Sequence, residues 1–264
     1  KTYMISSTSN VQIKNLIHLQ KKAKTREDQG AFVIEGIKMY EESRDGGYLI
    51  KAYISESLYA EKRLMADRFF TNYPYEVVRD SVLKEASETL TPQGIMAIVK
   101  KTEYDLNSML TDKDVNLILL EDIRDPGNLG TIVRTAEGAG VTGIILSKSS
   151  VDMYNPKVIR STMGAIYRMP FVYADDFTEV LRLLKKNNIM IYAAHLAAAS
   201  VYDEENYQGK CAIMIGNEAN GLSNEAVALS DSCIKIPMTG KVESLNAAIA
   251  AAILMYEVYR QKRN

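Results

Sequence analysis

The sequence predicts an α/β protein with two domains, the second built on a parallel sheet. Short apolar runs suited to strands alternate with helical patterns along the chain. The pattern changes at residue 115, where VNLILLE begins a series of apolar runs typical of strands buried on both faces. We expect a small N-terminal α/β domain at residues 1–104, a polar linker at 105–114 and a second domain at 115–264.

The composition is that of an ordinary globular protein, with 47% hydrophobic and 25% charged residues. No apolar run reaches the ~18 residues of a membrane span, and the start, KTYMISSTSN, lacks the apolar core of a signal peptide. We therefore expect a cytoplasmic protein with no membrane partner. Cys211 and Cys233 lie in apolar runs and are expected to be buried thiols. These cysteines and two separate histidines make no zinc-ligand pattern, so no metal is expected.

The first domain begins with a helical pattern whose basic residues are clustered. Acidic residues are absent before Glu27, although the net charge of the chain is −1. Nucleic-acid binding therefore has to rest on a local patch of this kind, because cationic side chains neutralise phosphates and release counterions. The alternative is a solvated helix face. We expect RNA contacts from Lys14, Lys21, Lys22, Lys24 and Arg26.

The remainder of the first domain alternates between strand patterns and helical patterns. LIKAYIS alternates apolar and polar residues as a strand does, and AFVIEG is a short strand that ends at Glu35 and Gly36. We expect strands at 31–36, 49–55 and 75–80, helices at 37–45, 56–70 and 80–89, and a turn followed by a closing strand at 91–101.

The second domain opens with a strand, a turn, a helix and a strand, which is the βαβ unit of a parallel sheet. In the turn DIRDPGNLG, Pro126 fixes φ and Asn128 can cap the helix, which runs to about Ala139. In this stretch Glu121, Asp122 and Asp125 flank Arg124, and these acidic residues need partners if RNA approaches. The expected helices that follow are 155–171, FTEVLRLLKKN and SNEAVALS, and the expected strands are VTGIILS, FVYA, IMIYAAHL, CAIMI and CIKIPM.

The last helix is expected from Ser244, as its N-cap, to about Lys262. Its apolar stripe includes Ile249, Met255 and Tyr256, and its many alanines allow another backbone to approach closely.

Three polar turns follow strands of the second domain: DPGNLG at 125–130, IGNEANGLS at 215–223 and the turn before the last helix. The carboxyl ends of parallel strands are where ligands bind in α/β folds. The sequence has no G-x-G-x-x-G, no phosphate loop and no hydrolase pattern. The turns therefore indicate a site at this edge without identifying its ligand.

The segments DPGNLGTIVRTAEGAG, IMIGNEANGLS and IPMTGKVESLNAAIAAAILMYE resemble, in order and spacing, the three motifs of the SpoU (TrmH-type) branch of the SPOUT RNA methyltransferases. The resemblance covers about residues 115–260. The basic start, FVIEG and TPQGIMAIV are similar to the RNA-binding domain that precedes the catalytic domain in rRNA-directed members. This implies a trefoil-knotted domain, a homodimer through that domain, and S-adenosylmethionine as methyl donor, with S-adenosylhomocysteine as product.

The resemblance also implies transfer to a ribose 2′-hydroxyl, which we expect in 23S ribosomal RNA. A tRNA 2′-O-methyltransferase and a non-catalytic RNA-binding homologue are the alternatives. Arg134 would either activate the hydroxyl or hold the adjacent phosphate, in its own subunit or in the neighbouring one. The implied catalytic residues are Asn128, Arg134, Glu218, Ser244 and Asn246, and the implied cofactor-binding residues are Gly216, Asn217, Ile236, Met238, Leu245, Asn246 and Ala247.

Overall fold

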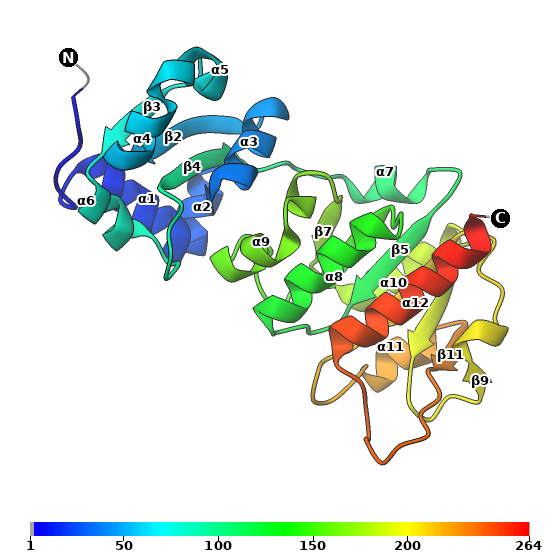
Figure 1. Ribbon diagram of the computed structural model, residues 1–264. Helices are drawn as coiled ribbons and strands as arrows, with labels where there is room; N and C mark the ends of the chain where they lie inside the picture. Colours follow the sequence, from blue (N-terminus) through cyan, green and yellow to red (C-terminus); the bar gives the residue numbers. More distant parts are fainter. Residues whose placement is uncertain (1–2, 264) are drawn as a thin grey trace. The chain divides into compact units, whose positions relative to one another are not determined.

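The computed structural model describes residues 3–263, which divide into two compact units. The first unit contains the chain up to Thr102 together with Tyr154–Tyr167, and the second contains Glu103–Met153 and the chain from Arg168 onward. Figure 1 labels most of the helices and many of the strands of both units. Segment 154–167 thus belongs to the first unit, although the sequence pattern places it within the second domain.

The first unit is built on a four-stranded sheet in the order β1-β4-β2-β3. Strand β4 runs antiparallel to β1 and β2, and β2 runs parallel to β3. The strands are β1 (Ala31–Glu35), β2 (Leu49–Ser55), β3 (Tyr75–Val78) and β4 (Ile95–Lys100). The helices are α1 (Val11–Lys21), α2 (Ala23–Gln29), α3 (Ile37–Asp45), α4 (Glu56–Lys62), α5 (Ala66–Phe70), α6 (Asp80–Ala86) and α9 (Pro156–Thr162), with short 3₁₀ turns η1 (Arg63–Met65) and η2 (Ala165–Tyr167).

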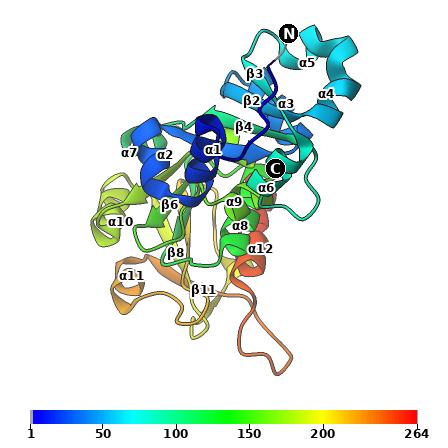
Figure 2. The same cartoon turned by 90° about the vertical axis from the view of Figure 1, so that its left-hand side faces the viewer.

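The second unit contains a seven-stranded sheet in the order β7-β6-β5-β10-β8-β11-β9, in which every neighbouring pair is parallel. Figure 2 shows α8 and α12 on one face of this sheet and α10 and α11 on the other. The predicted α/β class and parallel sheet are confirmed. The strands are β5 (Asn116–Leu120), β6 (Gly143–Ser147), β7 (Phe171–Ala174), β8 (Met190–Ala194), β9 (Ser200–Val201), β10 (Cys211–Ile215) and β11 (Ser232–Lys235). The helices are α7 (Leu106–Leu110), α8 (Pro126–Gly138), α10 (Phe177–Lys186), α11 (Asn224–Leu229) and α12 (Ala247–Lys262), with a 3₁₀ turn η3 (Tyr202–Glu204).

Two predicted helices are shorter than their sequence pattern. The helix expected at 56–70 is interrupted at Met65, whose backbone (φ −119°, ψ 23°) is not helical. The helix expected at 155–171 ends at Thr162, because Met163 (φ 50°) and Gly164 (φ 91°) adopt left-handed conformations that cannot continue it. The segment 105–114, expected as a linker, contains α7, and its Met109 and Leu110 are buried in the core of the second unit.

The basic N-terminal stretch forms two helices rather than one. Asn10 caps α1 by accepting a hydrogen bond from the backbone N–H of Gln12, and the extended backbone of Lys22 ends α1. Arg26 is buried, and its guanidinium donates to the carbonyls of Leu19 and Gln20, at 2.8 Å in each case. These carbonyls lie at the C-terminal end of α1, where orphan acceptors need partners. The prediction that Arg26 contacts RNA is therefore wrong.

The thiols differ in their burial. Burial raises the pKa of the Cys211 thiol to about 11. Cys233 is half-buried, so the expectation of two buried thiols holds only for Cys211. Within residues 3–263, no helix is both long enough and apolar enough to cross a membrane.

We expect the substitution Arg26→Leu to lower the free energy of unfolding by about 2 kcal/mol, because it removes two charge-assisted hydrogen bonds from a buried helix junction. Chemical denaturation of the full chain measures the difference. The matched control is Lys24→Leu, which changes an exposed side chain two positions away and should alter stability by no more than ~0.5 kcal/mol. Equal effects of the two substitutions would contradict a structural role for Arg26.

Candidate functional site

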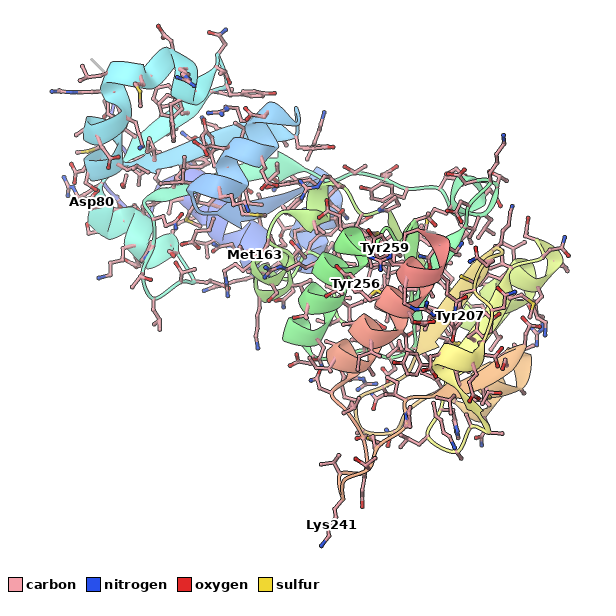
Figure 3. All side chains as sticks on the ribbon, turned by 45° about the vertical axis from the view of Figure 1, so that its right-hand side comes forward. Asp80, Met163, Tyr207, Lys241, Tyr256 and Tyr259 are labelled. Carbon is pink, nitrogen blue, oxygen red and sulfur yellow. The ribbon has the colours of Figure 1, made fainter. Side chains whose placement is uncertain are left out.

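A cavity of about 420 Å³ opens at the carboxyl ends of β8, β10 and β11 in the second unit. This volume lies within the ~300–1,000 Å³ range of small-molecule sites. The loop that joins β11 to α12 borders it, and Figure 3 shows Lys241 at the tip of this loop. The cavity is lined by Ala194, His195, Leu196, Ala197, Ile215, Gly216, Asn217, Glu218, Ala219, Asn220, Gly221, Leu222, Ile234, Lys235, Ile236, Met238, Glu243, Ser244, Leu245, Ala247, Ala250 and Leu254.

The turn after β10 folds back tightly on itself. Asn217 and Gly221 exchange backbone hydrogen bonds of 3.1 and 2.9 Å, and Gly221 has φ +67°. A Cβ atom on Gly216 would lie 2.3 Å from the backbone of Gly221 and of Leu222, so only glycine fits at 216. The Asn217 side chain accepts hydrogen bonds from the N–H groups of Ala219 and Asn220. This turn is therefore preformed.

The Glu218 carboxylate joins this turn to the start of α8. It accepts hydrogen bonds from the backbone N–H groups of Arg124 (3.3 Å) and Asp125 (3.1 Å) and from the Asn128 amide (3.2 Å). Burial alone would raise the pKa of Glu218, but these hydrogen bonds, with one from its own N–H, outweigh burial and lower the pKa below the ordinary value of 4.5. Glu218 is therefore an ionised acceptor that holds the α8 turn.

Asn128 and Asn246 extend this connection to the third turn. The Asn246 amide N–H donates to the Asn128 amide oxygen at 3.0 Å. Asn246 is also the N-cap of α12, since its oxygen accepts from the N–H groups of Ala248 and Ile249. Residues Asn246, Asn128 and Glu218 thus form a hydrogen-bonded chain, called here the Asn-Asn-Glu chain, that ties the three turns together.

Both predicted helix caps in this region are wrong. The cap of α8 is Asp125, whose carboxylate accepts the N–H of Asn128 at 2.7 Å, so Asn128 lies inside the first turn. Ser244 lies in the loop before α12, and the cap is Asn246, two residues later. The amide of Asn246 serves the helix with its oxygen and Asn128 with its N–H group.

The structure brings together most of the predicted site residues. Gly216, Asn217, Ile236, Met238, Leu245 and Ala247 line the cavity together with Glu218 and Ser244. Asn128 and Asn246 join the cavity through the Asn-Asn-Glu chain. Arg134 is exposed on α8 and makes no hydrogen bond or ion pair with any residue in 3–263. In the first unit, Lys14, Lys21, Lys22 and Lys24 are all exposed.

Acidic residues around Arg124 have partners that the sequence did not indicate. Glu121 accepts two hydrogen bonds from Ser223, at 2.7 and 2.6 Å. Asp122 adopts a left-handed backbone (φ 58°), accepts from the Asn217 amide and pairs with Arg124 at 2.7 Å. In the sequence, the acidic residues beside Arg124 indicated that partners were needed, but nothing there identified Ser223 or Asn217 as those partners.

His195 also lines the cavity, directly after β8. Its Nδ1 atom accepts a hydrogen bond from the backbone N–H of Ala197 at 3.2 Å, which ties the ring to the loop backbone. Among residues 3–263, no group of three or more His, Cys, Asp or Glu side chains could hold a metal ion.

The fold and cavity define an α/β protein with a site of small-molecule size at the carboxyl edge of a parallel sheet. A model of the SpoU rRNA methylase family matches residues 116–256, and a model of the MRM3-like substrate binding domain matches residues 10–97. The chain belongs to the SpoU rRNA methylase family and is an RNA methyltransferase.

Individual relatives are similar over nearly the whole chain. The 23S rRNA (guanosine(2553)-2′-O)-methyltransferase RlmP of Bacillus subtilis is 30% identical, with 96% of this chain and 98% of the relative covered. The crystal structure of an RNA 2′-O ribose methyltransferase is 31% identical, with a TM-score of 0.83 and coverage of 98% and 99%. The AdoMet-bound rRNA methyltransferase from Sinorhizobium meliloti is 28% identical, with a TM-score of 0.86 and coverage of 98% and 97%.

The Asn-Asn-Glu chain predicts a pH-dependent contribution of Glu218 to stability. Glu218→Gln should lower the free energy of unfolding by about 1 kcal/mol at pH 7, a modest value because the group is partly solvated. Since the folded pKa is depressed, the stabilisation is present above about pH 4.5 and is lost as pH falls through the folded value. Denaturation of both proteins between pH 3 and pH 7 (a range of about four units around this pKa) measures it. A stability difference that stays constant over this range would contradict the ionised role.

Proposed function

We propose that the protein transfers a methyl group from S-adenosylmethionine to a ribose 2′-hydroxyl of 23S ribosomal RNA. The observation that carries the proposal is the cavity at the carboxyl edge of the sheet, beside which the Asn-Asn-Glu chain joins the three turns. The substrate follows from the similarity to the 23S rRNA enzyme over nearly the whole chain and from the match of residues 10–97 to a substrate-binding domain.

The residues that line the cavity fit this cofactor. Apolar side chains of Ile236, Met238, Leu245 and Leu254 form walls suited to an adenine ring and an alkyl chain. Residues 236–246 lie outside helices and strands, so their backbone groups can bond to the polar edges of a ligand. Bound S-adenosylmethionine supplies an electrophilic methyl group on a sulfonium. We propose that it is held by Gly216, Asn217, Ile236, Met238, Leu245, Asn246 and Ala247.

The catalytic residues act mainly by positioning. In-line methyl transfer needs the ribose hydroxyl and the methyl carbon held in line, which can supply much of the rate. A free guanidinium remains protonated at neutral pH, so we assign Arg134 to the phosphate next to the target ribose, gripped through two N–H groups. Its exposure and lack of a partner within residues 3–263 leave it available for this contact. The Asn-Asn-Glu chain fixes the turns, and Ser244 borders the ribose.

In the first unit, RNA binding is assigned to Lys14, Lys21, Lys22 and Lys24. These exposed cations lie on α1 and α2 and at the junction between them, and Glu27 is the first acidic residue of the chain. The first unit then acts as the RNA-binding domain and the second unit as the catalytic domain, an assignment that the family matches at residues 10–97 and 116–256 support. The cytoplasm, where ribosomal RNA is modified, is the proposed location.

A homodimer through α12 accounts for an apolar face of the second unit. Ile249, Tyr256 and Tyr259 are 52%, 48% and 38% exposed. Their spacing places them on one side of the helix, where both tyrosines form an edge-to-face pair 5.8 Å apart (Figure 3). Exposed apolar patches of this kind mark interfaces. We also propose a trefoil knot in the catalytic domain, which the likeness to SpoU methyltransferase structures supports.

Arg134→Ala should reduce methyl transfer to 23S rRNA by at least about 10³-fold while leaving S-adenosylmethionine binding within about twofold, because the arginine contacts RNA and not the cofactor. Tritium transfer from labelled S-adenosylmethionine and isothermal titration measure the two quantities. Arg182→Ala, an exposed arginine on α10, is the control. Transfer by the unmodified protein to tRNA alone would replace the rRNA assignment with the tRNA alternative, and transfer to neither RNA would favour a non-catalytic protein.

Tyr256→Glu should raise the dimer dissociation constant by about 30-fold or more, because it places a charge in an apolar interface. Sedimentation velocity measures the association. Leu64→Glu is the control, since Leu64 is 91% exposed in the first unit and lies outside the proposed interface. A protein that remains monomeric without any substitution would overturn the dimer proposal.

A further inference from the structure

The first unit contains a second cavity, of about 310 Å³, that the methyl-transfer site does not use. It lies between the end of β1, the loop before β4 and helix α9. Its apolar wall includes Met39, Ile159 and Met163. Met163 is 46% exposed and has a left-handed backbone, a conformation that costs a non-glycine residue about 1 kcal/mol (Figure 3). Methionine side chains pack well against aromatic rings.

Gln20 supplies the observation that points to a ligand. Its side chain lines this cavity, is only 5% exposed, and has an amide oxygen without a hydrogen-bond partner among residues 3–263. A buried acceptor left unsatisfied costs about 1–3 kcal/mol. The neighbouring core residues of α1, Leu16 and Leu19, are apolar, and a leucine at position 20 would avoid the cost. A ligand that brings an N–H donor to the amide oxygen would satisfy it.

Glu35 provides a second acceptor in the same cavity. Its Oε1 atom accepts hydrogen bonds from the hydroxyls of Ser87 and Thr89, which fix the carboxylate in place. Its Oε2 atom accepts no hydrogen bond from the described part of the chain. The polar wall thus offers two acceptors and calls for a ligand that donates. The cations Lys38 and Arg160 also line the cavity, and they suit a ligand attached to phosphate.

We propose that this cavity receives one unpaired nucleobase of the substrate RNA that carries an exocyclic amino group, and that it discriminates against uracil. The proposal rests on the proposed function, which supplies the RNA. Proteins read single-stranded RNA by taking unstacked bases into pockets and bonding to their edges. The amino groups of cytosine, adenine and guanine are N–H donors that satisfy the Gln20 oxygen. Uracil has no amino group, and the single N–H donor on its pairing edge, N3–H, lies between two carbonyl oxygens that would be brought against the two acceptors.

The test measures binding of fluorescein-labelled rC₆, rA₆ and rU₆ to the full chain without cofactor, by fluorescence anisotropy. We expect rC₆ and rA₆ to bind about tenfold more tightly than rU₆, the ratio expected for one additional satisfied buried group. Gln20→Leu should reduce this preference to less than about twofold, again the loss of that one group. It should also raise the thermal unfolding midpoint, because it removes the unsatisfied oxygen. Gln29→Leu, on the exposed side of α2, is the matched control and should keep the preference.

Three results would overturn the proposal: equal binding of all hexamers, a preference that survives Gln20→Leu, or no saturable binding of any hexamer. A rise in unfolding midpoint without loss of preference would show that Gln20 is only a suboptimal core residue, which also overturns it. Because no methyl transfer is involved, a failure of the proposed enzymatic reaction leaves the hexamer result intact. A failure of the hexamer preference likewise leaves the methyl-transfer assay unaffected.

Discussion

The geometry of the proposed methyl-transfer site depends on one carboxylate and two amides. Glu218 draws together the turn after β10 and the backbone before α8, and Asn128 passes the connection to Asn246 at the start of α12. Helices α8 and α12 therefore begin next to each other, with their N-terminal ends beside the cavity at the carboxyl edge of the sheet. Loops alone would be a poor support for a precisely positioned reaction. Here the loops are fixed by helix starts and by a glycine turn that has no alternative residue at 216.

Charge is distributed so that acidic residues of the site do not oppose an RNA backbone. Glu121, Asp122 and Asp125 are each used by local donors: Ser223, Asn217 with Arg124, and the α8 backbone. The exposed cations of the first unit and Arg134 keep their charges available to solvent. The net charge of −1 therefore leaves room for the proposed RNA contacts, because the exposed cations Lys14, Lys21, Lys22 and Lys24 are clustered locally.

Local patterns predicted the strands and the positions of the turns well. β2 coincides with the LIKAYIS run, and the βαβ unit at 116–147 follows directly from its apolar runs. The predictions that were wrong concern side chains whose roles are set by tertiary contacts. Arg26 is buried because α1 breaks at Lys22, and the caps of α8 and α12 are set by which side chains meet across turns. The cavity beside Gln20 was equally invisible, since it is formed partly by α9, far along the chain. Such features depend on contacts between residues that are far apart in the sequence, which a short stretch of sequence does not reveal.

Segment 154–167 has a consequence for how this protein can be divided. It leaves the second unit after Met153, packs into the first, and returns at Arg168, so the polypeptide passes between units at three points. The rings of Phe32 and Tyr154 lie 4.7 Å apart within the first unit, and Tyr167 donates to the Met39 carbonyl. A fragment that stops near Thr102 would keep β4, the strand partner of β1, but would lack the Tyr154 ring that packs on Phe32 of β1. The first unit is therefore a discontinuous domain, so recombination between relatives has to exchange two stretches of sequence together.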